Sequence, residues 1–299
     1  MGERDDQDAL AERFEEHRGL LRSVAYRMLG SRTEADDAVQ ETWLRLSRVD
    51  PTEVDNLGGW LRTVVARICL DMLRACQRRR EEFPGDGLPD RAGHTTPGSA
   101  TDPEEEALLA ESVSRALLVV LERLAPAERI AFVLHDMFAV PFQEIAPVVG
   151  RTPVAAKKLA SRARVRVRGA ADSGSPGLAA DRRVVEAFLA AAREGDVEGL
   201  LAVLAPDVER TADAVALSPG ASPVSRGAHA VTRETLVFGR RARYADVALV
   251  DGAVGVVVAP AGRLLLVLRI TVEAGRVAAY EVIADPVRLA RVDVTVLDA

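Results

Sequence analysis

Cysteine is scarce in this sequence of 299 residues, with only Cys69 and Cys76. Two cysteines cannot form the disulfide framework of a small secreted protein. Both fall in an apolar helical pattern that places them on one face, so we expect reduced structural side chains in a cytosolic protein. The four histidines are scattered without the spacing of metal ligands. The sequence therefore predicts no metal site and no cofactor.

Long hydrophobic runs are also missing. The most apolar stretch, RLLLVLRITV at 263–272, is broken by Arg269 and is shorter than the ~18 apolar residues that indicate a membrane span. The N-terminal MGERDDQDAL is charged and lacks the apolar centre of a signal peptide. We therefore expect a cytoplasmic protein with no membrane insertion. The hydrophobic content of 48% is that of a globular protein, and the length suggests two or three domains.

The formal net charge is −6, yet one segment is strongly basic. Residues 150–169, GRTPVAAKKLASRARVRVRG, hold seven basic side chains and no acidic one. The Thr152-Pro153 pair is a helix-start signature with Thr152 as N-cap, so the charges lie on a helix with a defined beginning. A solvated helix face is the plain explanation of such a run, and an anionic partner is the alternative.

The residues before the basic run favour the anionic partner. PFQEIAPVV at 141–149 has the pattern of a helix that ends in a tight turn at Gly150. We expect the following helix to pack on it through Val154, Leu159 and Ala163. A helix, a tight turn and a basic helix together predict a helix-turn-helix, with the second helix in the DNA major groove.

The N-terminal part, from about residue 9 to 82, is helical throughout. Ser31 to Glu34 form a capping box that opens an acidic helix, EADDAVQETWLRLSR at 34–48. An acidic helix repels a polyanion, so this one suits a basic protein surface. Trp43 lies near the end of this helix, where a tryptophan is more often a core residue than a contact.

The next helix begins near Asn56 and combines Trp60 with several arginines. An aromatic side chain followed by arginines is the pairing that stacks an unpaired base and holds its backbone. A core position is the alternative for Trp60. The order of an acidic helix and then an aromatic and basic helix points away from a simple repressor.

Two segments have the composition of linkers. Residues 83–103 are rich in Pro, Gly, Ser and Thr and lack periodicity. Helical periodicity resumes at Glu104 and continues to about Gly169, and a second short linker follows at 171–180. The helical blocks on either side of the first linker therefore form separate domains.

After residue 180 the pattern changes to that of an α+β domain. Helices are expected at 181–195, 196–205 and 227–239, with an irregular stretch before the last. Strand-like runs follow, separated by turn signals such as Asp251-Gly252 and Ala274-Gly275, so they predict an antiparallel meander. The expected strands are 245–250, 253–259, 263–273 and 276–284.

Three segments carry a family resemblance: DDAVQETWLRL at 36–46, LGGWLRTVVARICLDMLR at 57–74, and LAPAERIAFVLHDMFAVPFQEIAPVVGRTPVAAKKLASRAR at 124–164. In this order they resemble regions two and four of bacterial extracytoplasmic-function (group four) RNA polymerase sigma factors. Residues 180 to about 291 more loosely resemble the SnoaL-like extension of the sigma-J-like subgroup. In that subgroup a proline-containing linker motif and an Asn-Pro-Asp-Lys-Leu-type motif are familiar, and here GDGLPD at 85–90 and ADPVRL at 284–289 stand in their places.

The resemblance implies a multidomain fold, with two all-α helical sigma domains, the second a helix-turn-helix, followed by an α+β SnoaL-like cone domain of the nuclear-transport-factor-two (NTF2) type. It implies an alternative sigma factor that binds RNA polymerase core and directs promoter-specific transcription initiation, regulated in cis by its C-terminal domain. The implied boundaries are region two at 9–82, a linker at 83–103, region four at 104–170, a linker at 171–180 and the SnoaL-like regulatory domain at 181–291.

The family pattern also implies which residues act. Those that would bind the beta-prime clamp helices of the polymerase core are Asp36, Asp37, Val39, Gln40, Glu41 and Trp43. Those that would recognise and melt the minus-ten element, together with the loop from Asp50 to Gly59, are Asn56, Trp60, Arg62, Arg67 and Arg74. Those that would read the minus-thirty-five element are Arg151, Thr152, Pro153, Ala155, Ala156, Lys157, Lys158, Ser161 and Arg162. The arginines expected on phosphates are Arg164, Arg166 and Arg168.

The expected partners are RNA polymerase core and promoter DNA, and an anti-sigma factor or a small ligand at the C-terminal domain is a further candidate. No catalytic residue is assigned, and we expect no enzyme. Residues of the C-terminal domain that would serve an isomerase, cyclase or hydrolase lack paired spacing; they are Asp207, Asp213, His229, Asp246 and Tyr280. A ligand-responsive helix-turn-helix repressor or activator and a fusion enzyme of the SnoaL-like type stay open as alternatives.

Overall fold

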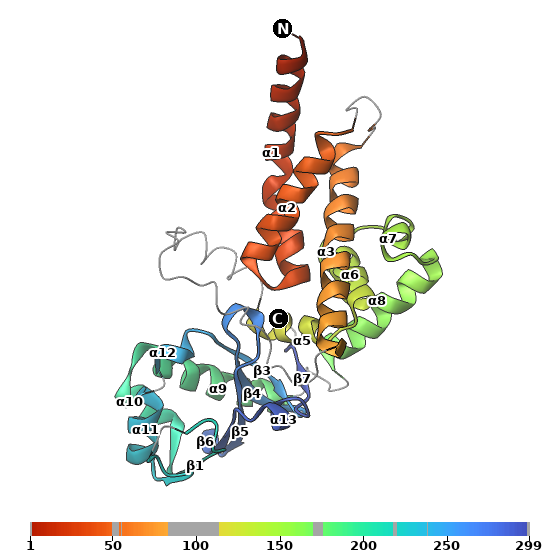
Figure 1. The fold of residues 1–299 in the computed structure, drawn as a ribbon. Coiled ribbons are helices and arrows are strands. Elements are labelled where there is room, and N and C mark those ends of the chain that lie inside the picture. The colour runs from red at the N-terminus through yellow and green to blue at the C-terminus, as the bar shows by residue number, and fades with distance from the viewer. Residues whose placement is uncertain are drawn as a thin grey trace. The chain divides into compact units, whose positions relative to one another are not determined.

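The structure, a computed structural model, describes residues 2–49, 54, 56–82, 114–169, 176–217, 220–237 and 239–297 (Figure 1). The expected linker at 83–103, with the GDGLPD motif, lies outside these residues, as do 104–113 and residues 171–175 of the second expected linker. The rest of that linker, 176–180, is the first part of helix α9 (Pro176–Glu194). The described chain forms two compact units. The N-terminal unit draws on Met1–Val113 and Leu124–Arg164, and the C-terminal unit on Ser114–Arg123 and Val165–Ala299.

The N-terminal unit opens with three helices. Helix α1 packs against the other two, and these pack against each other. Large apolar side chains such as Leu21, Met28, Leu46, Leu61 and Leu70 are almost completely buried and form the core of this bundle. The helices are α1 (Gly2–Leu29), α2 (Arg32–Leu46) and α3 (Leu57–Glu82).

Glycine and short polar side chains mark where these helices end and begin. Gly30 adopts the left-handed conformation with φ of 76°, which ends α1 at no steric cost to a side chain. The Ser31 hydroxyl accepts a hydrogen bond from the Glu34 N–H at 3.4 Å. The Asn56 side chain likewise accepts one from the Gly59 N–H at 3.0 Å. The helix starts expected at Ser31 and near Asn56 are therefore confirmed.

A second group of helices completes the N-terminal unit. Helix α7 ends at Gly150, whose φ of 66° is again left-handed, and α8 begins three residues later. The expected helix, tight turn and helix are therefore present. The elements of this group are α6 (Pro126–Phe132), the π-helical turn η2 (Val133–Met137), α7 (Phe142–Val149) and α8 (Pro153–Arg168), of which the residues to Arg164 belong to this unit.

The two groups of helices pack together within the N-terminal unit. Helix α3 contacts α6 and α7, and α1 contacts η2. The guanidinium group of Arg129, a residue only 5% exposed, donates to the backbone oxygen of Met28 at 2.7 Å. This bond satisfies one of the carbonyls that the end of α1 leaves without a helical partner. The Arg27 guanidinium lies 5.1 Å from the centre of the Phe138 ring, a cation–π contact between the groups.

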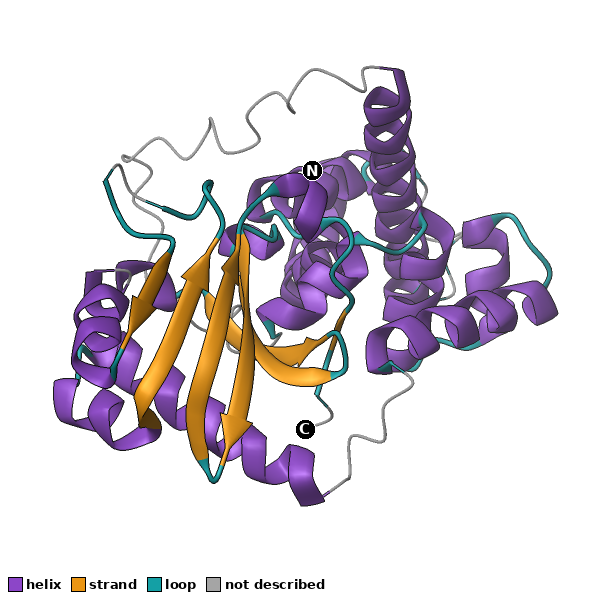
Figure 2. Ribbon diagram, turned by 90° about the horizontal axis from the view of Figure 1, so that it is seen from below, coloured by secondary structure: helices purple, strands orange, loops and turns teal. Residues whose placement is uncertain are grey.

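The C-terminal unit combines helices with one seven-stranded sheet (Figure 2). Its helices are α5 (Arg115–Glu122), α9 (Pro176–Glu194), α10 (Val197–Val203), α11 (Ala228–Val237), α12 (Gly239–Ala242), the 3-10 turn η3 (Pro260–Gly262) and α13 (Pro286–Leu289). Its strands are β1 (Leu204–Ala212), β2 (Val224–Arg226), β3 (Ala245–Val250), β4 (Ala253–Val258), β5 (Leu266–Glu273), β6 (Arg276–Ile283) and β7 (Val294–Thr295).

The strand order is β2-β1-β6-β5-β4-β3-β7. Strands β3 to β6 form the expected antiparallel meander. At two of its turns a residue and the following glycine both have positive φ, 52° and 82° at Asp251-Gly252 and 49° and 74° at Ala274-Gly275. This backbone twist matches that of the flanking strands. The turn signals in the sequence therefore placed these hairpins correctly.

Strand β1 lies outside the expected pattern. The sequence pattern extends a helix to Ala205, whereas α10 ends at Val203 and the next residue begins β1. Strand β1 pairs in parallel with β6, whose residues come much later in the chain. Because a parallel neighbour is reached through a long connection, no local turn signal announces it.

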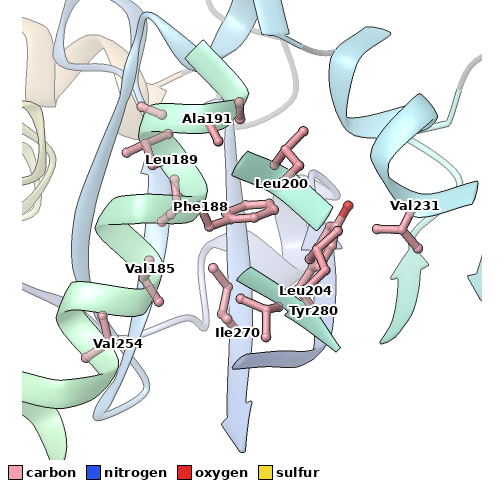
Figure 3. Close-up of a cluster of buried hydrophobic side chains, with 14 of the residues drawn as sticks. Val185, Phe188, Leu189, Ala191, Leu200, Leu204, Val231, Val254, Ile270 and Tyr280 are labelled. Carbon is pink, nitrogen blue, oxygen red and sulfur yellow. The ribbon is translucent and has the colours of Figure 1, made fainter. Parts of the chain in front are cut away.

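Helix α9 covers one face of the sheet. Figure 3 shows Val185 and Phe188 pointing from α9 toward Ile270 and Tyr280 of the sheet. The rings of Phe188 and Tyr280 are 5.6 Å apart between centroids and tilted by 53°, an arrangement that aromatic pairs favour. All four residues are buried. This cluster is the core that holds helix and sheet together.

Helix α5 is part of the C-terminal unit, although the sequence predicted it within region four. It packs against β3, β4, β7 and η3. At its end the Arg123 guanidinium donates to the backbone oxygens of Val292 at 2.5 Å and Leu289 at 3.1 Å. A Cβ on Gly262 would come within 3.0 Å of the Leu118 Cβ, so the turn η3 lies directly against the helix.

The last turn of α8 also joins this unit. The Val296 N–H donates to the backbone oxygen of Val167 at 2.8 Å, next to β7. Gly169, with φ of 70°, follows α8 so closely beside Thr295 that an added Cβ would lie 2.9 Å from the threonine Oγ1. The fold class is confirmed, because two groups of helices are followed by an α+β domain. The C-terminal unit in addition includes two pieces of the predicted region four, Ser114–Arg123 and the end of α8.

Candidate polymerase, DNA and ligand sites

The acidic face of α2 is the first candidate site. Asp36, Asp37 and Gln40 are exposed, as a protein-binding surface requires. The Asp36 carboxylate pairs with Arg22 of α1 at 2.8 Å, and Glu41 pairs with Arg45 one turn along at 3.0 Å. Exposed pairs of this kind contribute little to stability. These carboxylates can therefore exchange their partners for those of another protein.

Two residues assigned to this face have a different position. Val39 is only 4% exposed and belongs to the core between helices. Trp43 is half-buried, and its ring lies 5.1 Å from that of Phe14 of α1. The Val39 side chain lies on the buried side of α2 with Ala35 and Ala38, so it is not part of the exposed acidic face. Val39 and Trp43 hold α2 in place beneath the acidic surface.

The start of α3 is the second candidate site. Asn56 is exposed and caps the helix, which gives it a structural role beside the predicted one. Trp60 and Arg62 are half-buried in the first turns, while Arg67 and Arg74 are exposed further along. The helix thus carries an aromatic ring at its beginning and cationic groups along an exposed side. The loop before it falls mostly outside the described residues.

The third candidate site is the first half of α8. The Thr152 hydroxyl accepts a hydrogen bond from the Ala155 N–H at 3.3 Å, so the expected N-cap is present. Most of the predicted minus-thirty-five residues form one exposed surface at this end, where the helix dipole favours an anion. The exposed members are Arg151, Thr152, Pro153, Lys157, Lys158, Ser161 and Arg162.

The inner face of α8 differs from the expected one. Ala156, Ala160 and Ala163 are all completely buried, whereas Val154 is 67% exposed. The predicted packing of Ala163 is confirmed, and that of Val154 is wrong. The prediction that Ala156 reads DNA is wrong for its side chain, since a buried methyl group cannot reach a base. Ala155 is half-buried at the edge of the exposed surface.

The arginines toward the end of α8 already have partners. The Arg164 guanidinium pairs with Asp136 of η2, with a distance of 2.6 Å between Nη2 and Oδ1. Arg166 and Arg168 also take part in polar or electrostatic interactions within the protein. A phosphate contact from Arg164 would therefore compete with a bond inside the N-terminal unit.

The five candidate catalytic residues of the C-terminal unit do not converge. Asp207 and His229 are exposed. Asp213 accepts backbone hydrogen bonds from Ala216 at 3.0 Å and from Ala284 and Asp285 at 2.8 Å. Burial alone would raise the pKa of this carboxyl, but the three N–H donors and Arg288 hold the pKa below its ordinary value. Asp213 therefore fixes a turn and has no free base function.

Asp246 connects three elements of the C-terminal unit. Its carboxylate accepts the backbone N–H of Arg115 at 2.5 Å and lies 3.7 Å from the Arg193 guanidinium. Arg193 in turn donates to the backbone oxygens of Ala242 and Ala245 at 3.1 and 2.5 Å. Asp246 thus holds the first turn of α5, where a carboxylate also favours the helix dipole.

A cavity of about 90 Å³ lies between α9 and the sheet. Of the five candidate catalytic residues, only Tyr280 lines it. Sequence reasoning missed its polar pair, the Arg210 guanidinium and the Glu234 carboxylate, which form an ion pair. Arg210 also donates to the Ser222 backbone oxygen at 3.1 Å. The Tyr280 and Thr235 hydroxyl oxygens are 2.9 Å apart. Burial raises the pKa of Tyr280 to about 12.

Other functional groups are few among the described residues. In that part of the chain no group of three or more His, Cys, Asp or Glu side chains could hold a metal ion. Cys69 is buried, and burial raises the pKa of its thiol well above the ordinary value. None of the described helices has the length and apolar character to cross a membrane.

Comparison with known proteins identifies the helical parts. The family model for Sigma-70 region 2 matches residues 13–80, and that for Sigma-70 region 4 matches residues 114–167. The chain is 41% identical over 289 residues to the ECF RNA polymerase sigma factor SigJ of Mycobacterium tuberculosis, which covers 91% of each protein. It is 38% identical over 207 residues to the probable ECF sigma factor SigI of the same species, covering 69% of this chain and 71% of that one.

A solved structure is also similar. The crystal structure of M. tuberculosis SigJ matches 94% of this chain and 98% of its own, with 36% identity and a TM-score of 0.45. Two helical regions with an acidic and a basic exposed helix, followed by an α+β domain, define a transcription initiation factor with a C-terminal extension. The chain belongs to the extracytoplasmic-function (ECF) RNA polymerase sigma factors.

Proposed function

We propose that this sigma factor binds the polymerase core through the exposed acidic face of α2 and reads promoter DNA with α3 and α8. Three exposed residues of α2 would meet the clamp helices: Asp36, Asp37 and Gln40. The exposed N-terminal half of α8 would read the minus-thirty-five element. The single observation that carries this proposal is the separation of charge within the N-terminal unit, with an acidic exposed surface on α2 and a basic one on α8.

The two exposed surfaces suit different partners for electrostatic reasons. DNA carries one charge per ~1.7 Å of helix axis, so it repels α2 and attracts α8. A side chain that contacts a base edge with two hydrogen bonds discriminates bases by about 1–3 kcal/mol. Lys157, Lys158 and Arg162 lie on the first turns of α8, which is the part of a recognition helix nearest the bases.

Promoter binding must open the N-terminal unit. The minus-ten and minus-thirty-five elements lie more than one turn of DNA apart, and one turn spans about 34 Å. Helix α3, which would read the first element, packs directly against α6 and α7 beside α8. The Arg129 bond to Met28 and the contact of Arg27 with Phe138 would be lost on opening. The described arrangement is therefore that of the free protein.

The C-terminal unit would regulate the sigma module in cis by holding α5. The family model for region four begins at residue 114, so α5 lies inside that region. Its first turn is held by Asp246 and its end by the backbone oxygens of Leu289 and Val292. Leu289 belongs to the ADPVRL segment, which differs from the subgroup motif. This segment nevertheless contacts region four through Arg123.

The positions of the candidate catalytic residues favour a regulatory role of the C-terminal unit over a catalytic one. The candidate catalytic side chains are apart from one another, and Asp213 and Asp246 are engaged in structural bonds. Polymerase and promoter DNA are cytoplasmic in bacteria, so a protein that binds both acts there. An anti-sigma factor is a further candidate partner.

Run-off transcription with purified core polymerase tests the proposal. K157E combined with R162E should abolish promoter-specific transcripts while core binding in a pull-down is retained. D37R should instead weaken the binding of core polymerase, more than the double variant does. E194R, an equal charge reversal on an exposed part of α9, is the matched control and should change neither. Wild-type transcripts from the double variant, or wild-type core retention by D37R, would show that the corresponding surface is wrongly assigned.

The repressor alternative predicts a different result. A repressor with the same helix-turn-helix would bind duplex promoter DNA without polymerase, and D37R would leave that binding unchanged. A specific transcript that depends on added core polymerase excludes this function.

A further inference from the structure

The cavity of the C-terminal unit has the composition of a ligand site. Most of its wall is apolar, with Phe188 from α9 and Val256, Leu268 and Val282 from the sheet. Leu268 and Val282 remain partly exposed although they lie on the inner face of the sheet. Apolar walls without contact atoms lose dispersion energy, and a concave apolar site with a few convergent polar groups is the usual form of a small-molecule site.

The polar groups in the wall define what kind of molecule fits. Arg210 is only 5% exposed, and its charge is balanced by the Glu234 carboxylate. A ligand carboxylate at this place would face Glu234, and a ligand ammonium would face Arg210. Arg241 also lines the cavity but is exposed, so solvent screens its charge. The buried part of the site is therefore suited to an uncharged group.

Hydrogen-bond directions show what that group needs. The Thr235 hydroxyl donates to the Val231 backbone oxygen at 2.9 Å. It must then accept the hydrogen of the Tyr280 hydroxyl, 2.9 Å away, because each hydroxyl has one hydrogen to donate. The Tyr280 oxygen is left as an acceptor, and the Arg210 guanidinium has more N–H groups than its two bonds use. The site thus offers an acceptor and a donor, which a ligand hydroxyl satisfies.

The wall of the cavity is continuous with the surface that holds α5. Ala242 and Ala245 line the cavity, and Arg193 holds the backbone oxygens of both. Arg193 also pairs with Asp246, the residue after Ala245, whose carboxylate holds the Arg115 N–H at the start of α5. A molecule that displaces the Ala242–Ala245 segment would therefore displace the anchor of α5.

We propose that this cavity binds a small, uncharged, mainly apolar molecule with a hydroxyl group, and that the bound molecule loosens α5 through Asp246. The second part rests on the proposed regulation of region four by the C-terminal unit. The first part stands on the cavity alone. Binding and α5 mobility are both measurable without polymerase or DNA, so their failure is distinct from a failure to initiate transcription.

Equilibrium dialysis of the full-length protein against three aromatic probes tests the ligand class at neutral pH. 2-Naphthol should bind more tightly than naphthalene, which lacks the hydroxyl, and more tightly than 2-naphthoate, which carries a charge. Y280F keeps the ring but removes the acceptor, and should lower the affinity for 2-naphthol by about twofold to tenfold without changing that for naphthalene. No binding of 2-naphthol, or equal binding of 2-naphthoate, overturns the proposal.

A pair of variants tests the location. Ala216 is a buried residue of the wall, and the neighbouring Val215 is 60% exposed. A216W should fill the cavity and abolish 2-naphthol binding, whereas V215W adds the same side chain outside and should not. An equal loss of 2-naphthol binding in both variants, or binding that is retained in A216W, contradicts this location of the site. If A216W does not fold, the affinity of Y280F for 2-naphthol tests the location instead.

Hydrogen exchange of the full-length protein tests the coupling. Saturating 2-naphthol should accelerate exchange of the backbone amides of α5. An unchanged or slower exchange in the presence of bound 2-naphthol overturns the link between cavity and α5.

Discussion

The buried face of α8 is formed by small side chains. Ala156, Ala160 and Ala163 follow each other at intervals of four and three residues and are completely buried, while the larger Val154 and Val165 are exposed. The sequence pattern suggested Val154 as a packing residue. Spacing was the better guide, because residues three and four apart share a helix face whatever their volume.

This difference predicts opposite effects of one substitution at two nearby positions. A156E places an unpaired carboxylate in the core and should lower the free energy of unfolding by about 3 kcal/mol or more. V154E places the same group in solvent and should change it by less than about 0.5 kcal/mol. Urea denaturation of the two full-length variants measures both. Equal stability of the two would mean that α8 is rotated from the described orientation.

Asp213 predicts a pH dependence of stability. Its pKa is lowered in the folded protein, so its contribution is present above the pKa of about 4 that an aspartate has in an unfolded chain. That contribution is lost as the pH falls through the lower folded value. D213N should therefore lower the free energy of unfolding by about 1–3 kcal/mol at pH 7.

Denaturation of wild type and D213N across pH 2–7 measures this contribution. The difference between the two proteins should shrink steadily below pH ~4. A difference that stays constant with pH would show that the lost interaction does not depend on ionisation of Asp213. The sequence contains no sign of this role, because two of the three donor residues, Ala284 and Asp285, are brought to Asp213 by the fold.

At the scale of elements, local sequence signals correctly predicted turns and helix caps. Pairing between segments far apart in the chain could not be predicted from such signals. The hairpins at Asp251-Gly252 and Ala274-Gly275 and the caps at Ser31 and Thr152 depend on residues within a few positions of one another. Strand β1 depends on a parallel partner far along the chain. For the same reason the Arg210–Glu234 pair, which joins β1 to α11, was not predicted.

The cap of α3 predicts a measurable effect on the site at its first turn. N56A removes the acceptor for the Gly59 N–H and should lower the free energy of unfolding by about 1 kcal/mol. N56D retains an acceptor in the same place and should restore stability. Thermal or urea denaturation measures both. If N56A is as stable as wild type, the hydrogen bond to Gly59 contributes nothing to the helix.

At the scale of the whole molecule, the packing of regions two and four predicts a large movement on assembly. We expect energy transfer between dyes on an exposed position directly after α2 and one on α7 to fall when the protein binds core polymerase and promoter DNA. S47C and Q143C provide those positions, in a C76S background that removes the half-buried native thiol. Unchanged transfer in an active complex would mean that both promoter elements are reached without opening the N-terminal unit.

Helix α5 belongs by sequence to region four and by packing to the C-terminal unit. A sigma factor that simply acquired an extra domain by gene fusion would have this helix without the side chains that pack on the added sheet, so those side chains must arise within the older region. Helix α5 and the segment around Leu289 therefore have to be inherited together. Chimeras that exchange C-terminal domains between related sigma factors should stay regulated only when α5 is exchanged with them.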